Sequence, residues 1–383
     1  MVNEKPYKPD KEEATETATA IANEMATAIA TDQQNVTCEK TKSCIKHIVL
    51  CGGGHVGITQ ISILRHLLKK SFFEWKNIES MYATSVGAII AVMCALKYDL
   101  EEVETYIVQR PWHECESIDF GIENMIDLYQ SKGIFGEDVF MSILKPLLLA
   151  KDFTITSTLR DLYVYSQIEL NICTTKMEDF TPYILNYRTH PDMRIIQAVH
   201  MSGAIPMIFK PVFYEGSCYM DGGIVNNYPI ETCMYKQACT PQEVLGIKNN
   251  IKRTSGDNDN LSIHALSEKS TIVDVFLTFF SHYQYIRHQL KHSHEDKHED
   301  KREDKREHED EDKHENKNEG NHSSVKDAPI LYEVHTYTNG IRIEDLYLGV
   351  TDESYRQRLA DNGEICVDVF LKYVNNIERY RKN

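Results

Sequence analysis

Two consecutive segments of the chain repeat the same strand–turn–helix pattern, and this repeat constrains the fold more than any other feature. The apolar run Ile48–Cys51 is followed by three glycines and by a segment with helical spacing from Val56 to Lys70. The run from Ile78 to Thr84 is typical of a strand leading into Ser85, and the apolar stretch Val86–Leu96 follows as a helix. Two such units in succession indicate an α/β protein with a mainly parallel sheet and covering helices.

The rest of the chain divides into folded and polar parts. Residues 1–45 are polar without an apolar stripe, and we interpret them as a flexible tail. Lys291–Glu319 is a repetitive His/Glu/Asp/Lys/Arg tract, interpreted as a disordered charged insertion of about residues 291–326 within one domain of residues 46–380. Further strands are expected at Tyr163–Thr174, Pro182–Tyr187, Val212–Tyr214, Cys218–Asp221, Ile330–Thr338 and Ile341–Leu348, and a helix at Ser354–Tyr373.

Charge and cysteine content exclude several classes of function. A formal net charge of −16 argues against a nucleic-acid partner and against docking to anionic membranes by overall electrostatics. The ten cysteines form no CxxC pair, and the N-terminus lacks a cationic apolar signal region, so reduced core thiols are expected. No apolar run is long enough to span a membrane. We expect a cytoplasmic protein whose contact with membranes is peripheral.

The first candidate motif is Gly52-Gly53-Gly54-His55-Val56-Gly57, placed between a strand and a helix. Glycines let the backbone approach a ligand closely, and the free N–H groups at a helix start favour an anion. A phosphate or an oxyanion would suit this loop. A dinucleotide site also needs an acidic residue at the end of a second strand, and the nearby Glu74 has no such context.

The second motif is Ala83-Thr84-Ser85-Val86-Gly87, a GxSxG elbow with alanine in its first position. Small neighbours are needed because the serine sits on a strained strand-to-helix turn. The third motif contains Asp221, Gly222 and Gly223 at the end of an expected strand. Such a sequence is also common in tight turns, but a carboxylate here could act as the base for a serine in the same sheet.

These three motifs, in this order and at these separations, resemble the patatin-like phospholipase family. Residues 197–206 (QAVHMSGAIP) and the Asn226-Asn227 and Pro229 positions are also similar, so the resemblance covers about residues 46–230, with a weaker match at 335–373. The resemblance implies a three-layer α/β/α fold. It also implies a lipid acyl hydrolase of the phospholipase A or lysophospholipase type that acts through an acyl-enzyme, without a metal or other cofactor.

The resemblance also assigns roles to residues of the motifs. It implies Ser85 as the nucleophile, Asp221 as the proton acceptor of a Ser–Asp dyad, and Gly52, Gly53 and Gly54 as the oxyanion hole. The supporting motif positions are Gly57, Ala83, Gly87, Gly222 and Gly223. Two departures from the family pattern are Ala83, in place of glycine, and Val56, where many relatives carry Arg or Lys. The expected partner is a phospholipid or another acyl lipid.

Two alternatives remain open from the sequence. One is an α/β-hydrolase-type esterase with a Ser–Asp–His triad, because His264 and His282 follow Ser85 and Asp221 in the chain. The other is a non-catalytic lipid-binding protein of the same fold.

The stretch Thr271–Leu290 carries an aromatic-rich face at roughly helical spacing. A helix packed on the core is the favoured interpretation, and a peripheral surface that enters a lipid interface is the alternative.

Overall fold

The computed structural model describes residues 45–115, 132–251, 266–268, 270–287 and 331–382. The expected tail at 1–45 lies almost wholly outside these residues, as do the charged tract at 291–326 and His264. Among the described residues, no helix is both long and apolar enough to cross a membrane.

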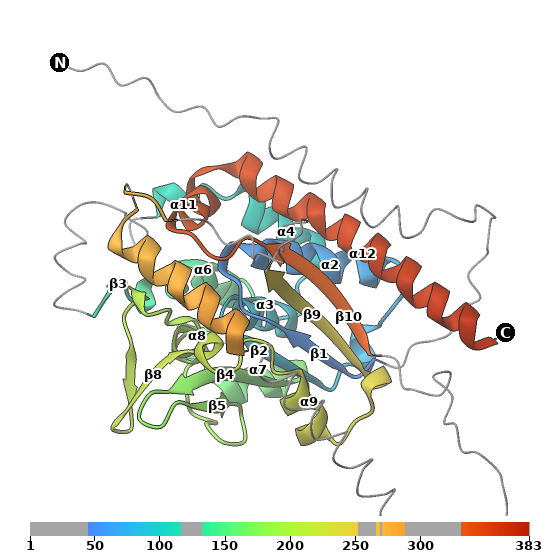
Figure 1. The fold of residues 1–383 in the computed structure, drawn as a ribbon. Coiled ribbons are helices and arrows are strands. Elements are labelled where there is room, and N and C mark those ends of the chain that lie inside the picture. The colour runs from blue at the N-terminus through green and yellow to red at the C-terminus, as the bar shows by residue number, and fades with distance from the viewer. Residues whose placement is uncertain (1–44, 116–131, 252–265, 269, 288–330, 383) are drawn as a thin grey trace, which may run out of the picture. The chain divides into compact units, whose positions relative to one another are not determined.

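The fold is built around an eight-stranded, mainly parallel sheet (Figure 1). Its strand order is β10-β9-β1-β2-β4-β8-β7, and β5 pairs with β4 outside this path. Strands β10, β9, β1, β2 and β4 run parallel, whereas β5, β7 and β8 make antiparallel pairs. A two-stranded sheet pairs β3 with β6. The strands are β1 (His47–Leu50), β2 (Ser80–Thr84), β3 (Gly133–Phe135), β4 (Glu169–Lys176), β5 (Thr181–Leu185), β6 (Met207–Phe209), β7 (Val212–Tyr214), β8 (Ser217–Asp221), β9 (Val244–Ile251) and β10 (Tyr332–Thr338).

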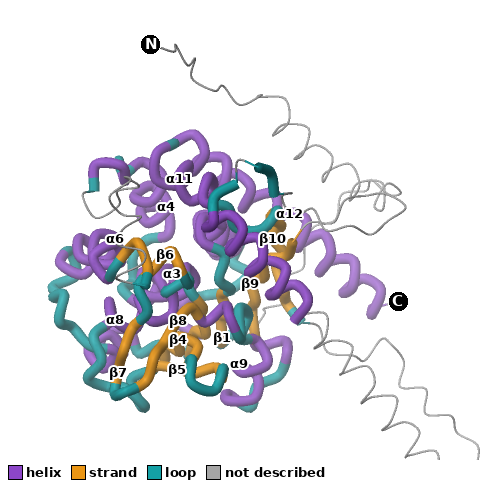
Figure 2. Tube along the Cα trace, turned by 60° about the vertical axis from the view of Figure 1, so that its left-hand side comes forward, coloured by secondary structure: helices purple, strands orange, loops and turns teal. Residues whose placement is uncertain are grey.

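Helices connect and cover these strands (Figure 2). The α-helices are α2 (Gly57–Lys69), α3 (Val86–Ala95), α4 (Leu100–Gln109), α6 (Glu137–Leu149), α7 (Leu159–Ser166), α8 (Ile195–Gly203), α9 (Ile230–Gln237), α11 (Ile343–Thr351) and α12 (Glu353–Lys382), and a further helix spans residues 272–287. Short 3-10 helices are η1 (Gly54–Val56), η2 (Trp75–Asn77), η3 (Trp112–Glu114), η4 (Gly222–Ile224) and η5 (Pro241–Glu243).

The central strands are buried on both faces, which explains their unbroken apolar sequences. In β1, Ile48 and Leu50 belong to the main core with residues of α2, α3 and α12, whereas Val49 points to the other face. There it packs with Ile230 and Cys233 of α9. This alternation follows from the two-residue period of a strand. The expected three-layer α/β/α architecture with a mainly parallel sheet is confirmed.

Two of the expected strands are wrong in part. The first four residues of the expected strand Tyr163–Thr174 belong instead to α7 (Leu159–Ser166), because Thr158 and Asp161 make a capping box that starts a helix. Residues 343–348 of the expected strand Ile341–Leu348 belong to α11, which continues to Thr351. The apolar positions of α11 follow helical spacing at Ile343, Leu346 and Val350, and the last two face a cavity.

Candidate active site

Ser85 occupies a sharp turn between the buried strand β2 and helix α3. Its backbone angles are φ 54° and ψ −123°, a conformation that is unusual for a residue with a side chain. Small neighbours make room for the turn, because a Cβ on Gly87 would lie 2.8 Å from the Leu50 carbonyl oxygen and 2.9 Å from that of Cys51. Ala83, at the preceding small position, is fully buried. The local geometry is that of a nucleophile elbow.

Ser202 of α8 holds this elbow, and the sequence analysis assigned it no role. The Ser85 N–H donates to Ser202 Oγ at 2.8 Å, and the Ser202 hydroxyl donates to the Cys173 carbonyl at 2.5 Å. The serine hydroxyl therefore links the elbow to β4. A small polar residue on an otherwise apolar helix was the available signal, and it lies within the similar segment 197–206.

Asp221 is brought beside the elbow by strand pairing. Thr84 of β2 pairs with Cys173 of β4, and the next β4 residue, Thr174, pairs with Asp221 at the end of β8. The Thr175 hydroxyl also donates to the Asp221 carbonyl at 2.9 Å. Both motif residues therefore lie at the same edge of the sheet, although 136 positions separate them in the sequence.

The Asp221 carboxylate is buried, with 2% of the residue exposed, and no cation of the described residues pairs with it. Its Oδ1 accepts the Gly223 N–H at 2.6 Å, whereas Oδ2 makes no geometrically regular hydrogen bond in the described part of the chain. Burial raises the pKa of Asp221 to about 6, and the Ser85 hydroxyl and the Gly223 amide partly offset this rise. A carboxylate whose pKa lies near neutrality can exchange protons readily.

The backbone of the glycine loop passes beside Ser85. A Cβ on Gly52 would lie 3.1 Å from Ser85 Cβ, so the loop backbone passes next to the serine. The Gly52 N–H donates to the backbone carbonyl of Asn227 at 3.1 Å. In return, the side-chain amide of Asn227 donates to the Gly52 carbonyl at 3.3 Å. The N–H groups of Gly53 and Gly54 donate to no described residue. These two amides are therefore free to bind an anion, whereas that of Gly52 is already engaged.

The other motif glycines are required by close packing. A Cβ on Gly57 would lie 2.3 Å from Val86 Cγ2, and one on Gly222 would lie 2.4 Å from the Cys173 carbonyl oxygen. A Cβ on Gly223 would meet Gln284 Nε2 at 2.7 Å. A larger residue at Gly222 would push against the β4 backbone, one at Gly57 would displace Val86 next to Ser85, and one at Gly223 would require the Gln284 side chain to move.

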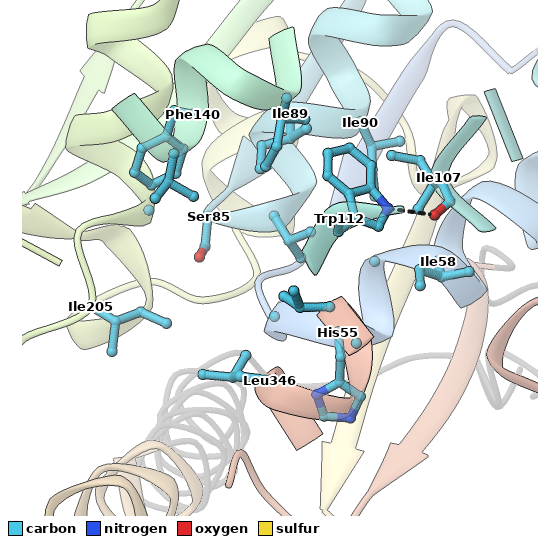
Figure 3. A pocket seen from close by; sticks show the side chains of 18 of the residues that line it. His55, Ile58, Ser85, Ile89, Ile90, Ile107, Trp112, Phe140, Ile205 and Leu346 are labelled. Carbon is cyan, nitrogen blue, oxygen red and sulfur yellow. Dashed lines mark hydrogen bonds between the residues drawn. The ribbon is translucent and has the colours of Figure 1, made fainter. Parts of the chain in front are cut away.

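None of the histidines in the described residues hydrogen-bonds to Asp221 or Ser85. His282 Nδ1 interacts with the Thr278 carbonyl of its own helix at 2.9 Å, and His200 Nε2 interacts with the Lys210 carbonyl at 3.0 Å. The ring of His55 points away from Ser85 (Figure 3). The described geometry therefore contains a serine and a carboxylate without an intervening imidazole.

Ser85 opens onto an apolar cavity of about 240 Å³ (Figure 3). The side chains of Ile89, Ile90 and Phe140 line it near α3 and α6, and Trp112 and Leu346 come from η3 and α11. The Trp112 N–H donates to the Ile107 carbonyl at 2.8 Å, so its polar atom is satisfied. An elongated apolar group attached to a reacting carbonyl at Ser85 would find a matching environment here.

No group of three or more His, Cys, Asp or Glu side chains is placed to hold a metal ion in the described ranges. The histidine-rich tract lies outside them.

Comparison with known proteins gives a family match over the segment that carries all three motifs. Residues 48–234 match the family model described as patatin-like phospholipase. An uncharacterized protein, R571, of Acanthamoeba polyphaga mimivirus is 30% identical over 200 residues, which are 51% of this chain and 64% of that protein. The probable lipid hydrolase 463L of Invertebrate iridescent virus 6 is 26% identical over 191 residues, 49% of this chain and 62% of that protein. The matched region thus spans less than two thirds of either relative.

Solved structures with detectable likeness include two bacterial proteins. VipD from Legionella pneumophila has a TM-score of 0.41 at 16% identity, with 88% of this chain and 73% of that chain covered. The type III effector protein ExoU has a TM-score of 0.28 at 16% identity, with 53% and 46% covered.

The family match contains Ser85, Asp221 and the glycine loop, which the structure brings to one edge of the sheet. Residues 48–234 therefore form a patatin-like phospholipase domain.

Proposed function

We propose that this chain is a lipid acyl hydrolase, of the phospholipase A or lysophospholipase type, that cleaves carboxylic esters with Ser85 as nucleophile and Asp221 as base. One observation carries the proposal: a serine on a strained elbow lies beside a buried, cation-free carboxylate at the mouth of an apolar cavity. The patatin-like domain and the relative named as a probable lipid hydrolase support it.

The geometry supports a two-step reaction. Ser85 Oγ attacks the ester carbonyl carbon while its proton passes to Asp221 Oδ2, the carboxylate oxygen without a regular hydrogen bond. The carbonyl oxygen becomes an oxyanion, and the N–H groups of Gly53 and Gly54 bind it in this proposal. Each such donor contributes about 3–4 kcal/mol of transition-state stabilisation. Gly52 is left out of this role because its N–H is bonded to Asn227.

Collapse of the tetrahedral intermediate breaks the ester bond. The leaving alcohol takes the proton from Asp221, and the acyl group stays on Ser85 with its chain in the apolar cavity. Water then attacks the acyl-enzyme, and Asp221 accepts the proton of that water before passing it back to Ser85. The same carboxylate thus serves both steps.

The test compares Ser85→Ala with Ser354→Ala, a matched change at an exposed position of α12. Labelling by a fluorophosphonate probe and hydrolysis of a short-chain acyl ester should be lost at Ser85, by at least about 10³-fold for hydrolysis. The Ser354 variant should keep both. Undiminished labelling of Ser85→Ala would contradict the assignment. A comparable loss in His264→Ala or His282→Ala would favour the triad instead.

We further propose that the helix at 272–287 contacts the lipid surface. Its inner face packs on the core through Val273, Leu277 and Phe280. Its outer face exposes an apolar stripe, with relative exposures of 59% for Ile272, 43% for Val275, 66% for Phe279 and 53% for Ile286. One face of this helix packs on the core, and we propose that the opposite face enters the lipid interface.

The helix that carries this outer stripe contacts the candidate active site, because the Gln284 side chain donates to the Gly223 carbonyl at 3.0 Å. Phe279→Ser should weaken binding to neutral phosphatidylcholine vesicles while leaving the melting temperature unchanged. Phe276→Ser is the matched change at a half-buried position and should lower the melting temperature. Unaltered vesicle binding by Phe279→Ser would contradict the proposed contact.

A further inference from the structure

A second cavity, of about 160 Å³, is lined by His55 together with residues at the end of β10 and in α11 and α12. His55 lines both cavities, and its ring points away from the apolar one (Figure 3). The second cavity is closed by the end of β10, the turn at Asn339, the start of α11 and two turns of α12. Because His55 belongs to η1, one wall of this cavity is the turn that carries the free amides of Gly53 and Gly54.

The lining of the second cavity is polar, and two of its buried atoms have no hydrogen-bond partner. These atoms are His55 Nδ1 and Asn339 Oδ1, two of the six unpaired buried side-chain atoms in the described part of the chain. A buried polar group without a hydrogen-bond partner costs about 1–3 kcal/mol, so two such atoms at one cavity call for an explanation. A bound molecule that supplies both partners would remove that cost.

The two charged side chains that line the cavity pair with each other. Arg342 donates to both Asp345 oxygens, at 2.9 and 2.8 Å, and also pairs at 3.0 Å with Glu344, which is not among the lining residues. The Tyr355 hydroxyl donates to Asp345 Oδ1 at 3.2 Å. Burial lowers the pKa of His55, which favours its neutral form. An ionic ligand would therefore find no unmatched charge, whereas a neutral molecule with several hydroxyl groups could both donate and accept.

We propose that this second cavity binds a small neutral polyol, through hydrogen bonds to Asn339 Oδ1 and His55 Nδ1. The polyol is either a free molecule or the hydroxylated head of a lipid, and both sources offer the same chemistry. Occupancy would fix the His55 side chain and, through it, the turn from Gly53 to Val56. The site thus lies next to the proposed oxyanion loop but uses none of the groups assigned to hydrolysis.

Binding is tested first without hydrolysis, in the Ser85→Ala chain, by ligand-detected NMR with glycerol and with myo-inositol. Asn339→Leu removes the acceptor and fills the cavity, and Asn362→Leu fills it from the α12 wall. Either change should weaken polyol binding at least about fivefold, which corresponds to one neutral hydrogen bond. Asn375→Leu, an exposed position on the same helix, is the control and should bind as the parent does.

A free polyol and the hydroxylated head of a lipid are then distinguished with two soluble esters of one fatty acid, a glyceryl ester and an ethyl ester. This second arm rests on the proposed function, whereas the NMR arm does not. If the site holds a lipid head, Asn339→Leu lowers the ratio of kcat/KM for the glyceryl over the ethyl ester at least about fivefold. If the site holds a free polyol, that ratio stays unchanged while NMR binding is lost. The proposal is overturned if the parent chain binds no polyol. It is also overturned if Asn339→Leu and Asn362→Leu both bind polyol as well as the parent does. Either result assigns the cavity to water.

Discussion

Asp221 and Asp345 are both buried carboxylates, with 2% and 7% of each residue exposed, yet their surroundings differ in one respect. Asp345 has a guanidinium partner in Arg342 and a hydroxyl donor in Tyr355. Asp221 has the Gly223 amide and the neighbouring Ser85 hydroxyl, and no cation from the part of the chain that the structure describes. Burial raises the pKa of Asp221 to about 6. At Asp345 burial has the same upward effect, but Arg342 and the Tyr355 hydroxyl outweigh it and lower the pKa below its usual range.

The difference separates a carboxylate that can react from one that holds structure. Paired with a cation, Asp345 stays ionised over the whole physiological range, and it links α11 to α12 through the Tyr355 hydroxyl. Left unpaired, Asp221 is a destabilised anion that gains by accepting a proton. Perturbed carboxylates without a compensating charge are typical of catalytic bases.

The largest expected effect comes from Asp221→Asn. The amide keeps the shape of the carboxylate but cannot accept a proton, so hydrolysis of a soluble ester should fall by about 10³-fold or more. The fold should persist, and at pH 7 the variant should be more stable than the parent by up to about 3 kcal/mol, because a buried charge is removed. Activity and urea denaturation measured on the same preparations check both parts. A variant that loses activity and stability together would contradict this view of Asp221.

The pH dependence of hydrolysis should report the Asp221 carboxylate directly. Asp221 must be ionised to accept a proton, so kcat/KM should rise about tenfold per pH unit below its pKa and level off above about pH 6. A pH profile with a soluble ester between pH 4.5 and 8 measures this. His282→Ala should leave the midpoint in place, and a shift of the midpoint in that variant would point to a histidine base.

Stability should respond to pH in opposite directions at the two carboxylates. The folded pKa of Asp221 exceeds the unfolded value near 3.8, so its contribution is unfavourable above about pH 6 and disappears as pH falls toward 4. The folded pKa of Asp345 is lowered, so its stabilisation is present above the unfolded value and is lost only as pH falls through the folded pKa. The advantage of Asp221→Asn should therefore vanish near pH 4.

How much of this could be read from the sequence depends on how local each feature is. Ser85 and the glycines around it form a contiguous pattern whose turn geometry demands small residues, and the structure places them at a strand end. Asp221 could be proposed because its motif accompanies the other two. Ser202 could not, because its role arises only when α8 packs beside β2 and β4.

The apolar cavity also could not be predicted from the sequence, because it forms only when separate segments pack together. Its lining comes from α2, α3, α4, η3, α6, α8 and α11, and no single segment carries a pattern that announces a cavity. Helix α11 was expected as a strand because apolar and charged residues alternate from Ile341 to Glu344. The helix is instead supported by the local Arg342–Asp345 pair and by Leu346 and Val350 at the cavity, and the cavity contacts are tertiary.

Removing the cation should make Asp345 resemble Asp221. In Arg342→Met the carboxylate keeps only the Tyr355 hydroxyl, so its pKa should rise and the variant should lose about 1–3 kcal/mol of stability at pH 7. About a third of the Arg342 side chain is exposed, which keeps the loss below that of a fully buried pair. Urea denaturation at pH 7 and pH 4 checks this, because the loss should shrink once Asp345 is protonated. Equal loss at both pH values would mean that packing, and not charge, explains it.

The smallest effect is expected from Tyr355→Phe, which removes one hydroxyl and keeps the ring. Burial and the nearby Asp345 raise the pKa of Tyr355, so the hydroxyl stays protonated and donates to the carboxylate at 3.2 Å. That bond is long, and Asp345 Oδ1 also accepts from Arg342 at 2.8 Å, so the loss should be about 1 kcal/mol. Tyr373→Phe, at an exposed position of the same helix, should change stability by less than about 0.5 kcal/mol and serves as the control. A loss at Tyr355 larger than that of Arg342→Met would show that the hydroxyl, and not the guanidinium, is what keeps Asp345 from behaving as Asp221 does.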